Sequence, residues 1–372
     1  MRDAAILVAA LRDPASVLLL DAHGWTALLT IARAEQLIGT LSVRLRTLDV
    51  PAPISAMLDD ARNNAEYQRR TALWEADCAR RALAEYNGKV VLMKGTAYVA
   101  AGLKAGEGRH IGDLDIMVAA QNLAQAERLL LDNGGWEWVK EDAYDDAYYR
   151  DHMHELPPMI HKERDRMIDV HHTILPLTAR PTPDAAAMLA DAIGLDLDKP
   201  LPFRGGVGVG PVNGDQGLNT RPTPNPSPKG EGLYVFAPAD MVCHCAAHLI
   251  ADGDLSGGLR NLWDMHCLLT EFAERKGDFW QELDGRAKHH GLAKDVRRAI
   301  RLSSRVYGTE IPESWNRSSA IDTLFSRRML ARDEWGRGSA KFTRLAFYIR
   351  SHWLRMPPMM LARHLWTKWR KA

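Results

Sequence analysis

The chain has 372 residues, of which 46% are hydrophobic and 26% are charged, and this composition excludes an intrinsically disordered protein. Its 48 Lys and Arg residues nearly balance its 47 Asp and Glu residues, so the chain as a whole lacks the basic excess typical of a nucleic-acid-binding protein. Four irregularly spaced cysteines exclude a disulfide scaffold, and no apolar run predicts a transmembrane helix, so we expect a soluble, cytoplasmic protein.

The N-terminal part of the chain is predicted to be helical. Apolar residues recur at helical spacing over residues 25–37. Pro51 and Pro53 then interrupt the pattern, and an Ala- and Arg-rich segment with a solvated polar face follows, from about residue 54 to residue 86. We expect residues 1–86 to form an N-terminal helical region.

The apolar period changes after the turn signal Asn87-Gly88. Residues 154–160 and 167–175 can pair as a hairpin, and Gly134-Gly135 is a good stop for a preceding helix. Residues 87–200 therefore predict an α+β core with a mixed sheet of about five strands. The expected strands are residues 89–93, 111–118, 136–140 and the two arms of the hairpin, and the expected helix covers residues 121–133.

A Pro- and Gly-rich segment follows this core. Residues 200–232 hold 7 of the 19 prolines and 8 of the 28 glycines and show no apolar period. Such a segment buries too little apolar surface to offset the entropy lost on ordering, so residues 201–232 predict a disordered insert. The helical period resumes after it, and we expect a helical domain over residues 233–326.

The C-terminal segment, residues 327–372, is predicted to form basic, aromatic helices. Residues 341–372 contain eight Lys and Arg residues and no Asp or Glu, whereas residues 1–340 have a net charge of −7. The simplest interpretation is a docked helix with a solvated basic face. The alternative is weak docking of residues 341–372 on a protein partner or on the inner face of the membrane, which would make the protein peripheral to it.

Two carboxylates on one predicted strand are candidate metal ligands. Side chains alternate between the two faces of a strand, so Asp113 and Asp115 project from the same face. Two close carboxylates repel each other unless a cation neutralises them, and Mg²⁺ or Mn²⁺ prefers such oxygen ligands. A solvated strand edge is the simpler alternative.

A strand-to-helix turn, Lys94-Gly95-Thr96, precedes this strand. Glycine lets backbone N–H groups approach a phosphate, and a lysine or a hydroxyl adds a further donor, although Lys94 could also be an ordinary surface lysine. A metal pair beside such a turn is what nucleotidyl transfer requires.

A third carboxylate is expected on a neighbouring strand, and Asp169 is the best candidate, both as a metal ligand and as the base that takes a proton from the acceptor. On a strand, His171 shares the face of Asp169, so it lies near the acceptor or is a packed histidine. A zinc site formed by His152, His154 and His161 is not expected, because their spacing is not that of a recurrent zinc motif.

These motifs resemble those of the nucleotidyltransferase superfamily that includes DNA polymerase β, with Thr96 in place of the usual Ser. The chain more closely resembles a bacterial family of uncharacterised nucleotidyltransferases over roughly residues 24–269, apart from the insert. The resemblance implies a polymerase β-like fold, Mg²⁺ and an NTP. It adds Arg109 and Gly112 to the nucleotide-binding residues, although Arg109 could instead pair with an Asp of the strand motif.

The sequence thus predicts a Mg²⁺-dependent nucleotidyltransferase that moves an NMP from an NTP, expected to be ATP, to a hydroxyl of unknown identity. The alternative is a non-catalytic module that keeps the fold and docks a partner through its basic tail. A nucleic-acid polymerase is disfavoured, because the basic excess is confined to that tail.

Overall fold

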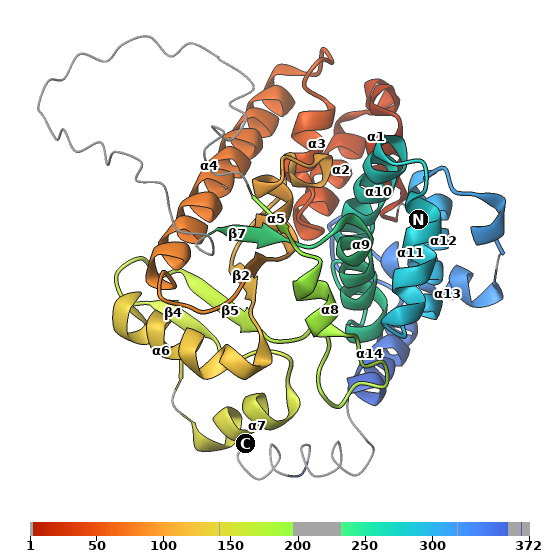
Figure 1. Ribbon diagram of the computed structural model, residues 1–372. Helices are drawn as coiled ribbons and strands as arrows, with labels where there is room; N and C mark the ends of the chain where they lie inside the picture. The colour runs from red at the N-terminus through yellow and green to blue at the C-terminus, as the bar shows by residue number, and fades with distance from the viewer. Residues whose placement is uncertain (1–2, 141, 196–231, 318, 356–365, 367–372) are drawn as a thin grey trace, which may run out of the picture.

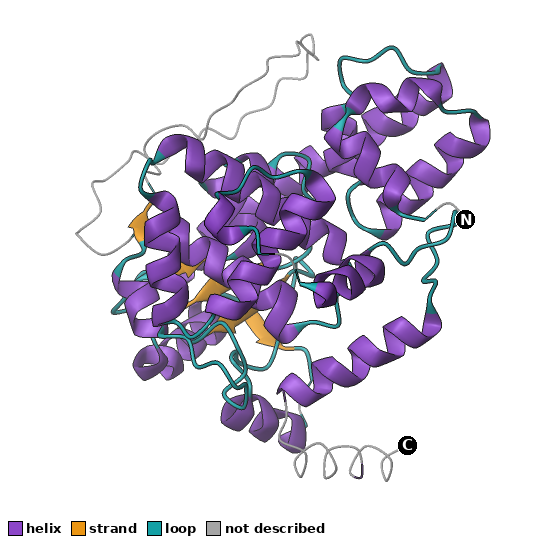
Figure 2. Ribbon diagram, turned by 90° about the vertical axis from the view of Figure 1, so that its right-hand side faces the viewer, coloured by secondary structure: helices purple, strands orange, loops and turns teal. Residues whose placement is uncertain are grey.

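The computed structural model describes residues 3–140, 142–195, 232–317, 319–355 and 366. A single mixed sheet of seven strands lies among helices from both ends of the chain (Figures 1 and 2). This arrangement confirms the predicted α+β class with flanking helical regions. No helix in these ranges is long and apolar enough to cross a bilayer.

The strand order is β3-β4-β5-β2-β1-β7-β6. The central strand β2 runs antiparallel to β1 and parallel to β5, so the sheet is mixed at the position where the acidic motif lies. The strands are β1 (Val90–Leu92), β2 (Leu114–Met117), β3 (Trp136–Trp138), β4 (Met159–His161), β5 (Met167–His171), β6 (Ile193–Gly194) and β7 (Leu233–Val235).

The five expected strands are present, and two further short strands, β6 and β7, extend the sheet to seven. Both are very short, and β7 adjoins the Pro- and Gly-rich segment, so neither shows a measurable period in the sequence. β7 pairs in parallel with β1, and this tertiary contact decides its conformation. The insert predicted at residues 201–232 lies, except for Gly232, outside the described residues.

The helices between the strands are short. Lys94 opens α5 directly after β1, so the predicted strand-to-helix turn is present. These elements are α5 (Lys94–Ala100), η2 (Lys104–Gly106), η3 (Ala120–Asn122), α6 (Leu123–Asn133), α7 (Ala143–His152) and α8 (Ala185–Ala190).

The N-terminal helices lie on one side of the sheet, where the long α4 runs across the upper left of Figure 1. α4 packs against α3, α5 and β2 and so supports the strand that bears the acidic motif. It begins directly after Pro51, where proline is well tolerated, and ends at Ala82, four residues before the predicted end. These elements are α1 (Ala5–Arg12), η1 (Pro14–Leu19), α2 (Ala22–Ala34), α3 (Ile38–Arg44) and α4 (Ala52–Ala82).

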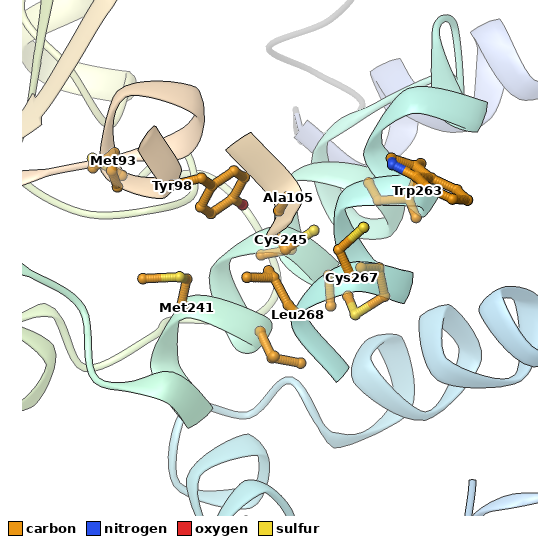
Figure 3. Packing of buried hydrophobic residues seen from close by; sticks show 14 of the residues in the cluster. Met93, Tyr98, Ala105, Met241, Cys245, Trp263, Cys267 and Leu268 are labelled. Atoms are coloured by element: carbon orange, nitrogen blue, oxygen red, sulfur yellow. The ribbon is translucent and has the colours of Figure 1, made fainter. Parts of the chain in front are cut away.

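The C-terminal helices pack on the other side of the motif. Figure 3 shows Met93, directly before α5, and Tyr98, within α5, facing Met241 and Cys245 of α9 and Leu268 of α10. The turn after β1 therefore shares one hydrophobic core with helices more than 140 residues later in the chain. These helices are α9 (Pro238–Ala246), continued by a π-helical stretch Ala247–Asp252, then α10 (Gly258–Arg275), α11 (Phe279–His289), α12 (Ala293–Tyr307), η5 (Glu313–Trp315), α13 (Ala320–Met329) and α14 (Lys341–Arg355).

The division of the chain at residues 86, 200, 232 and 326 stays a prediction, although β7, beyond the third boundary, belongs to the same sheet as β1. In α14, Phe347 is buried against Phe325 with ring centroids 4.9 Å apart, which docks the helix. Its outer face carries exposed Phe342, Leu345 and Ile349, so it is apolar as well as basic. Most of the tail beyond α14 lies outside the described residues.

We expect the fold to lose stability in mild acid because of His266 on α10. Burial, with Arg44, Arg12 and Lys104 nearby, lowers the pKa of His266 to about 4, and its Nδ1 lies 2.8 Å from the Thr309 hydroxyl. Between pH 6.5 and 4 the unfolded chain binds the proton more readily, so stability falls by up to about 3 kcal/mol. Urea unfolding at pH 7 and pH 4.5 measures this loss. A His266→Gln variant should flatten the pH dependence, whereas the exposed control His23→Gln should not, and an unchanged slope in His266→Gln would contradict the assignment.

Candidate active site

An acidic cluster forms where β2 and β5 run side by side in parallel. The register pairs Asp115 with Asp169, and Asp113 lies immediately before β2. One carboxylate oxygen from each of the three residues lies within 4.8 Å of the other two. Asp113 is exposed, Asp169 is half-buried and Asp115 is buried. The structure thus brings together the three carboxylates that the sequence predicted to meet.

Two side chains, Lys94 and His171, hold Asp115 in its charged form. The Lys94 Nζ lies 2.5 Å from Asp115 Oδ1, and His171 Nε2 lies 3.0 Å from the same oxygen. Although burial opposes ionisation, these two partners keep the pKa of Asp115 well below its usual range. Asp115 in turn raises the pKa of Lys94 despite the burial of that lysine. Both groups are therefore charged at neutral pH.

Asp169 has the opposite electrostatic environment. Burial, with the neighbouring carboxylates Asp115 and Glu155, raises the pKa of Asp169 to about 7. A cation held between Asp113, Asp115 and Asp169 would relieve this repulsion, and three carboxylates are a donor set suited to Mg²⁺ or Mn²⁺. The residues present therefore fit the divalent metal that the fold implies.

Lys94 itself has an unusual backbone conformation. Its φ is +47°, in the left-handed region, at the point where the extended Met93 leads into α5. The N–H of Met93 donates to the carbonyl of Asp115 at 3.0 Å, which fixes the turn against β2. A non-glycine residue in this conformation costs about 1–2 kcal/mol, so the surrounding structure holds Lys94 there, toward the acidic cluster.

Gly95 and Thr96 are buried, whereas the residues of an open phosphate-binding turn are exposed. A Cβ on Gly95 would overlap the guanidinium of Arg109, so packing alone already requires glycine here. The Thr96 hydroxyl is buried without a hydrogen-bond partner. A phosphate could therefore reach this turn through the first backbone N–H groups of α5 and through Lys94, and not through the Thr96 side chain.

A Gly95→Ala substitution is expected to destabilise the protein by about 1–3 kcal/mol, because the added methyl group forces the Arg109 guanidinium to move. The matched control is Gly112→Ala, since the nearest atom to a Cβ there is His110 Nε2 at 4.0 Å. Thermal unfolding of both variants compares the two positions, and equal Tm values would refute the packing argument.

Arg109 does not pair with the acidic cluster. Its guanidinium makes a bidentate ion pair with Asp264 of α10, with Nη2 and Nε at 2.9 and 3.0 Å from Oδ2. It also lies 5.3 Å from the ring centroid of Tyr98. The sequence reasoning missed Asp264, which is one of three charged residues, with Arg260 and Glu271, among the buried residues of α10.

Of the other predicted residues, Gly112 is exposed beside Asp113, and His171 is buried with 1% exposure. His171 lies between Asp115 and Glu155, whose Oε2 is 3.4 Å from His171 Nδ1, so the structure gives it a supporting position under Asp115. Sequence reasoning also missed Glu155, which faces His171 across an isolated antiparallel bridge. His161 lies apart, packed edge-on against Trp136 at 5.3 Å between ring centroids.

The mixed sheet with an acidic cluster at its central strands is the arrangement expected of a nucleotidyltransferase fold. The chain belongs to the family described as uncharacterised nucleotidyltransferases, whose family model matches residues 21–199 and 217–308. Searches of curated proteins and of solved structures found no significant match.

Proposed function

We propose that this protein transfers a nucleoside monophosphate from an NTP to an acceptor hydroxyl with release of pyrophosphate. The observation that carries the proposal is the meeting of Asp115 and Asp169, on two adjacent parallel strands, with Asp113 immediately before the first of them. Membership of a nucleotidyltransferase family supports it independently. The position of Lys94 beside this cluster adds a cation where a triphosphate would approach.

In this reaction, Asp169 accepts the proton of the acceptor hydroxyl, and the acceptor oxygen forms a bond to the α-phosphorus. The bond between that phosphorus and the oxygen bridging to the β-phosphate breaks, and the electron pair leaves with pyrophosphate. Lys94 and the backbone N–H groups of Gly95 and Thr96 would contact the β- and γ-phosphates. Exposed Gly112 leaves room for the nucleotide beside Asp113.

The metal proposed for this site is Mg²⁺, with Mn²⁺ as the alternative, held by the three carboxylates. When bound, it supplies neutralisation of the charge on the triphosphate. We expect ATP as the nucleotide. The carboxylates act on the phosphates alone, so they are compatible with a small molecule, a peptide or a protein side chain as the acceptor.

The test is transfer of label from a panel of α-³²P-NTPs, with mass detection of modified acceptors in cell lysate. Wild-type protein with Mg²⁺ should label an acceptor, and the Asp113→Ala/Asp115→Ala double variant should not. Equal labelling by the two proteins would falsify the proposal.

Calorimetric titration separates this function from the alternative of a non-catalytic module. A nucleotidyltransferase should bind an NTP in the presence of Mg²⁺. If no NTP binds to the folded wild-type protein, the chain acts instead as an interaction module that retains the fold.

A further inference from the structure

A second group of metal-ligating side chains lies behind the acidic cluster. His154, Glu155 and His171 each offer a ligand atom, and these atoms lie within 4.8 Å of one another. The Glu155 Oε2 is 3.4 Å from His171 Nδ1 and 3.8 Å from His154 Nε2. Ligands bound at about 2.0–2.1 Å in a tetrahedral zinc site are separated by about 3.4 Å, so the spacing here is close to that of a formed site.

The backbone around this group is firmly held. Glu155 and His171 face each other in an antiparallel bridge, which places their side chains on the same side. The N–H of His172 donates to the carbonyl of His154 at 2.9 Å, and the N–H of Leu156 donates to that of Val170 at 2.9 Å. The three side chains therefore project from a segment fixed to the end of β5, as a preorganised site requires.

An independent observation points to a missing partner. His171 Nδ1, the ring nitrogen that faces Glu155, is buried and makes no hydrogen bond, and the His171 side chain is only 1% exposed. A buried imidazole nitrogen without a partner is costly unless a further group binds it. Glu155 Oε2 lies 3.4 Å from His171 Nδ1, but the contact does not have hydrogen-bond geometry.

The other ring nitrogen of His171, Nε2, makes a contact that is common for histidines that bind metals. A histidine that binds a metal through one ring nitrogen commonly donates the other N–H to a carboxylate, which fixes the tautomer. His171 Nε2 meets that condition, since it lies 3.0 Å from Asp115 Oδ1. His171 would thus connect the second site to the acidic cluster through a hydrogen bond.

We propose that His154, Glu155 and His171 form a second metal site, distinct from the Asp113–Asp115–Asp169 cluster, for a zinc-type divalent cation. Two imidazoles and one carboxylate are a ligand set that zinc favours over magnesium. The site lets the cation fix the segment of His154 and Glu155 against β5 and hold His171 as a donor to Asp115. This inference stands whether or not the protein transfers nucleotides.

The test uses the full-length protein after removal of metals with a chelator. Titration with Co²⁺ alone, read by its visible ligand-field bands, reports tetrahedral nitrogen-containing coordination, and Zn²⁺ should displace the Co²⁺. His154→Gln and Glu155→Gln should each weaken Co²⁺ binding by about tenfold or more. The matched control is His172→Gln, which changes the histidine adjacent to His171 and should bind Co²⁺ as wild type does.

Two further measurements keep the result interpretable. An Asp113→Asn/Asp169→Asn variant should retain the Co²⁺ bands, because those carboxylates belong to the other site. Zn²⁺ should raise the Tm of the wild type and not that of His154→Gln, with circular dichroism showing that the variant is folded. The proposal is overturned if wild type shows no such bands, if His154→Gln and Glu155→Gln bind Co²⁺ equally well, or if loss of the two aspartates alone abolishes the bands.

Discussion

An Asp169→Asn variant is expected to lose about 10³-fold in nucleotidyl transfer while remaining folded. The amide keeps the size of the side chain but can neither accept the acceptor's proton nor contribute a negative charge to the metal site. Asp169 is half-buried beside Asp115 and Glu155, so removing its charge relieves repulsion and should not unfold the protein. Label transfer from α-³²P-NTP with saturating Mg²⁺ measures the effect.

The matched control for this variant is Asp132→Asn, which removes an exposed carboxylate from α6, outside the cluster. Its activity should equal that of wild type. Transfer by Asp169→Asn at or near the wild-type rate would mean that Asp169 is a strand-surface charge, and that the base, if one is needed, lies elsewhere.

An Arg109→Met variant is expected to lose about 3–5 kcal/mol of unfolding free energy. Arg109 is paired with Asp264, and their side chains are only 10% and 4% exposed. Removing the guanidinium leaves the Asp264 carboxylate buried without its bidentate partner, and breaking a buried pair on one side costs far more than the pair contributes. Urea unfolding, analysed by linear extrapolation, measures the loss.

The double variant Arg109→Met/Asp264→Leu is the control, because it replaces both charged partners with apolar side chains of similar size. It should recover most of the stability lost in Arg109→Met. If the double variant is as unstable as the sum of the two single variants, the two residues do not act as a pair. The same cycle tests whether α10 secures the loop that precedes the acidic strand.

Local pattern predicted the chemistry-bearing elements well. The strand within residues 89–93 and the helix that follows it were predictable. A short apolar run that ends in a Lys-Gly turn fits few structures other than a buried strand followed by a turn. The spacing of Asp113 and Asp115 and the hairpin that presents Asp169 follow from the period-two alternation of strands. These predictions depend on residues that are close together in the chain, so they can be made from one sequence.

The partners of the site residues were not predictable in the same way. Arg109 pairs with Asp264, which lies 155 residues further along the chain, and Gly95 is required by the side chain of Arg109. The pairing of β7 with β1 and the bridge between Glu155 and His171 likewise depend on how the chain folds back. No local period reports such contacts.

The sequence by itself determined the α+β class and indicated the nucleotidyltransferase family, because both rest on residue types at short spacing, and it proposed the three aspartates as one site. Only the tertiary structure decided that Lys94 and His171 share Asp115, that Arg109 is committed to α10, and that His154 and Glu155 join His171. The physical reason is that charge pairing and burial act through space, so the state of each ionisable group depends on neighbours brought together by folding.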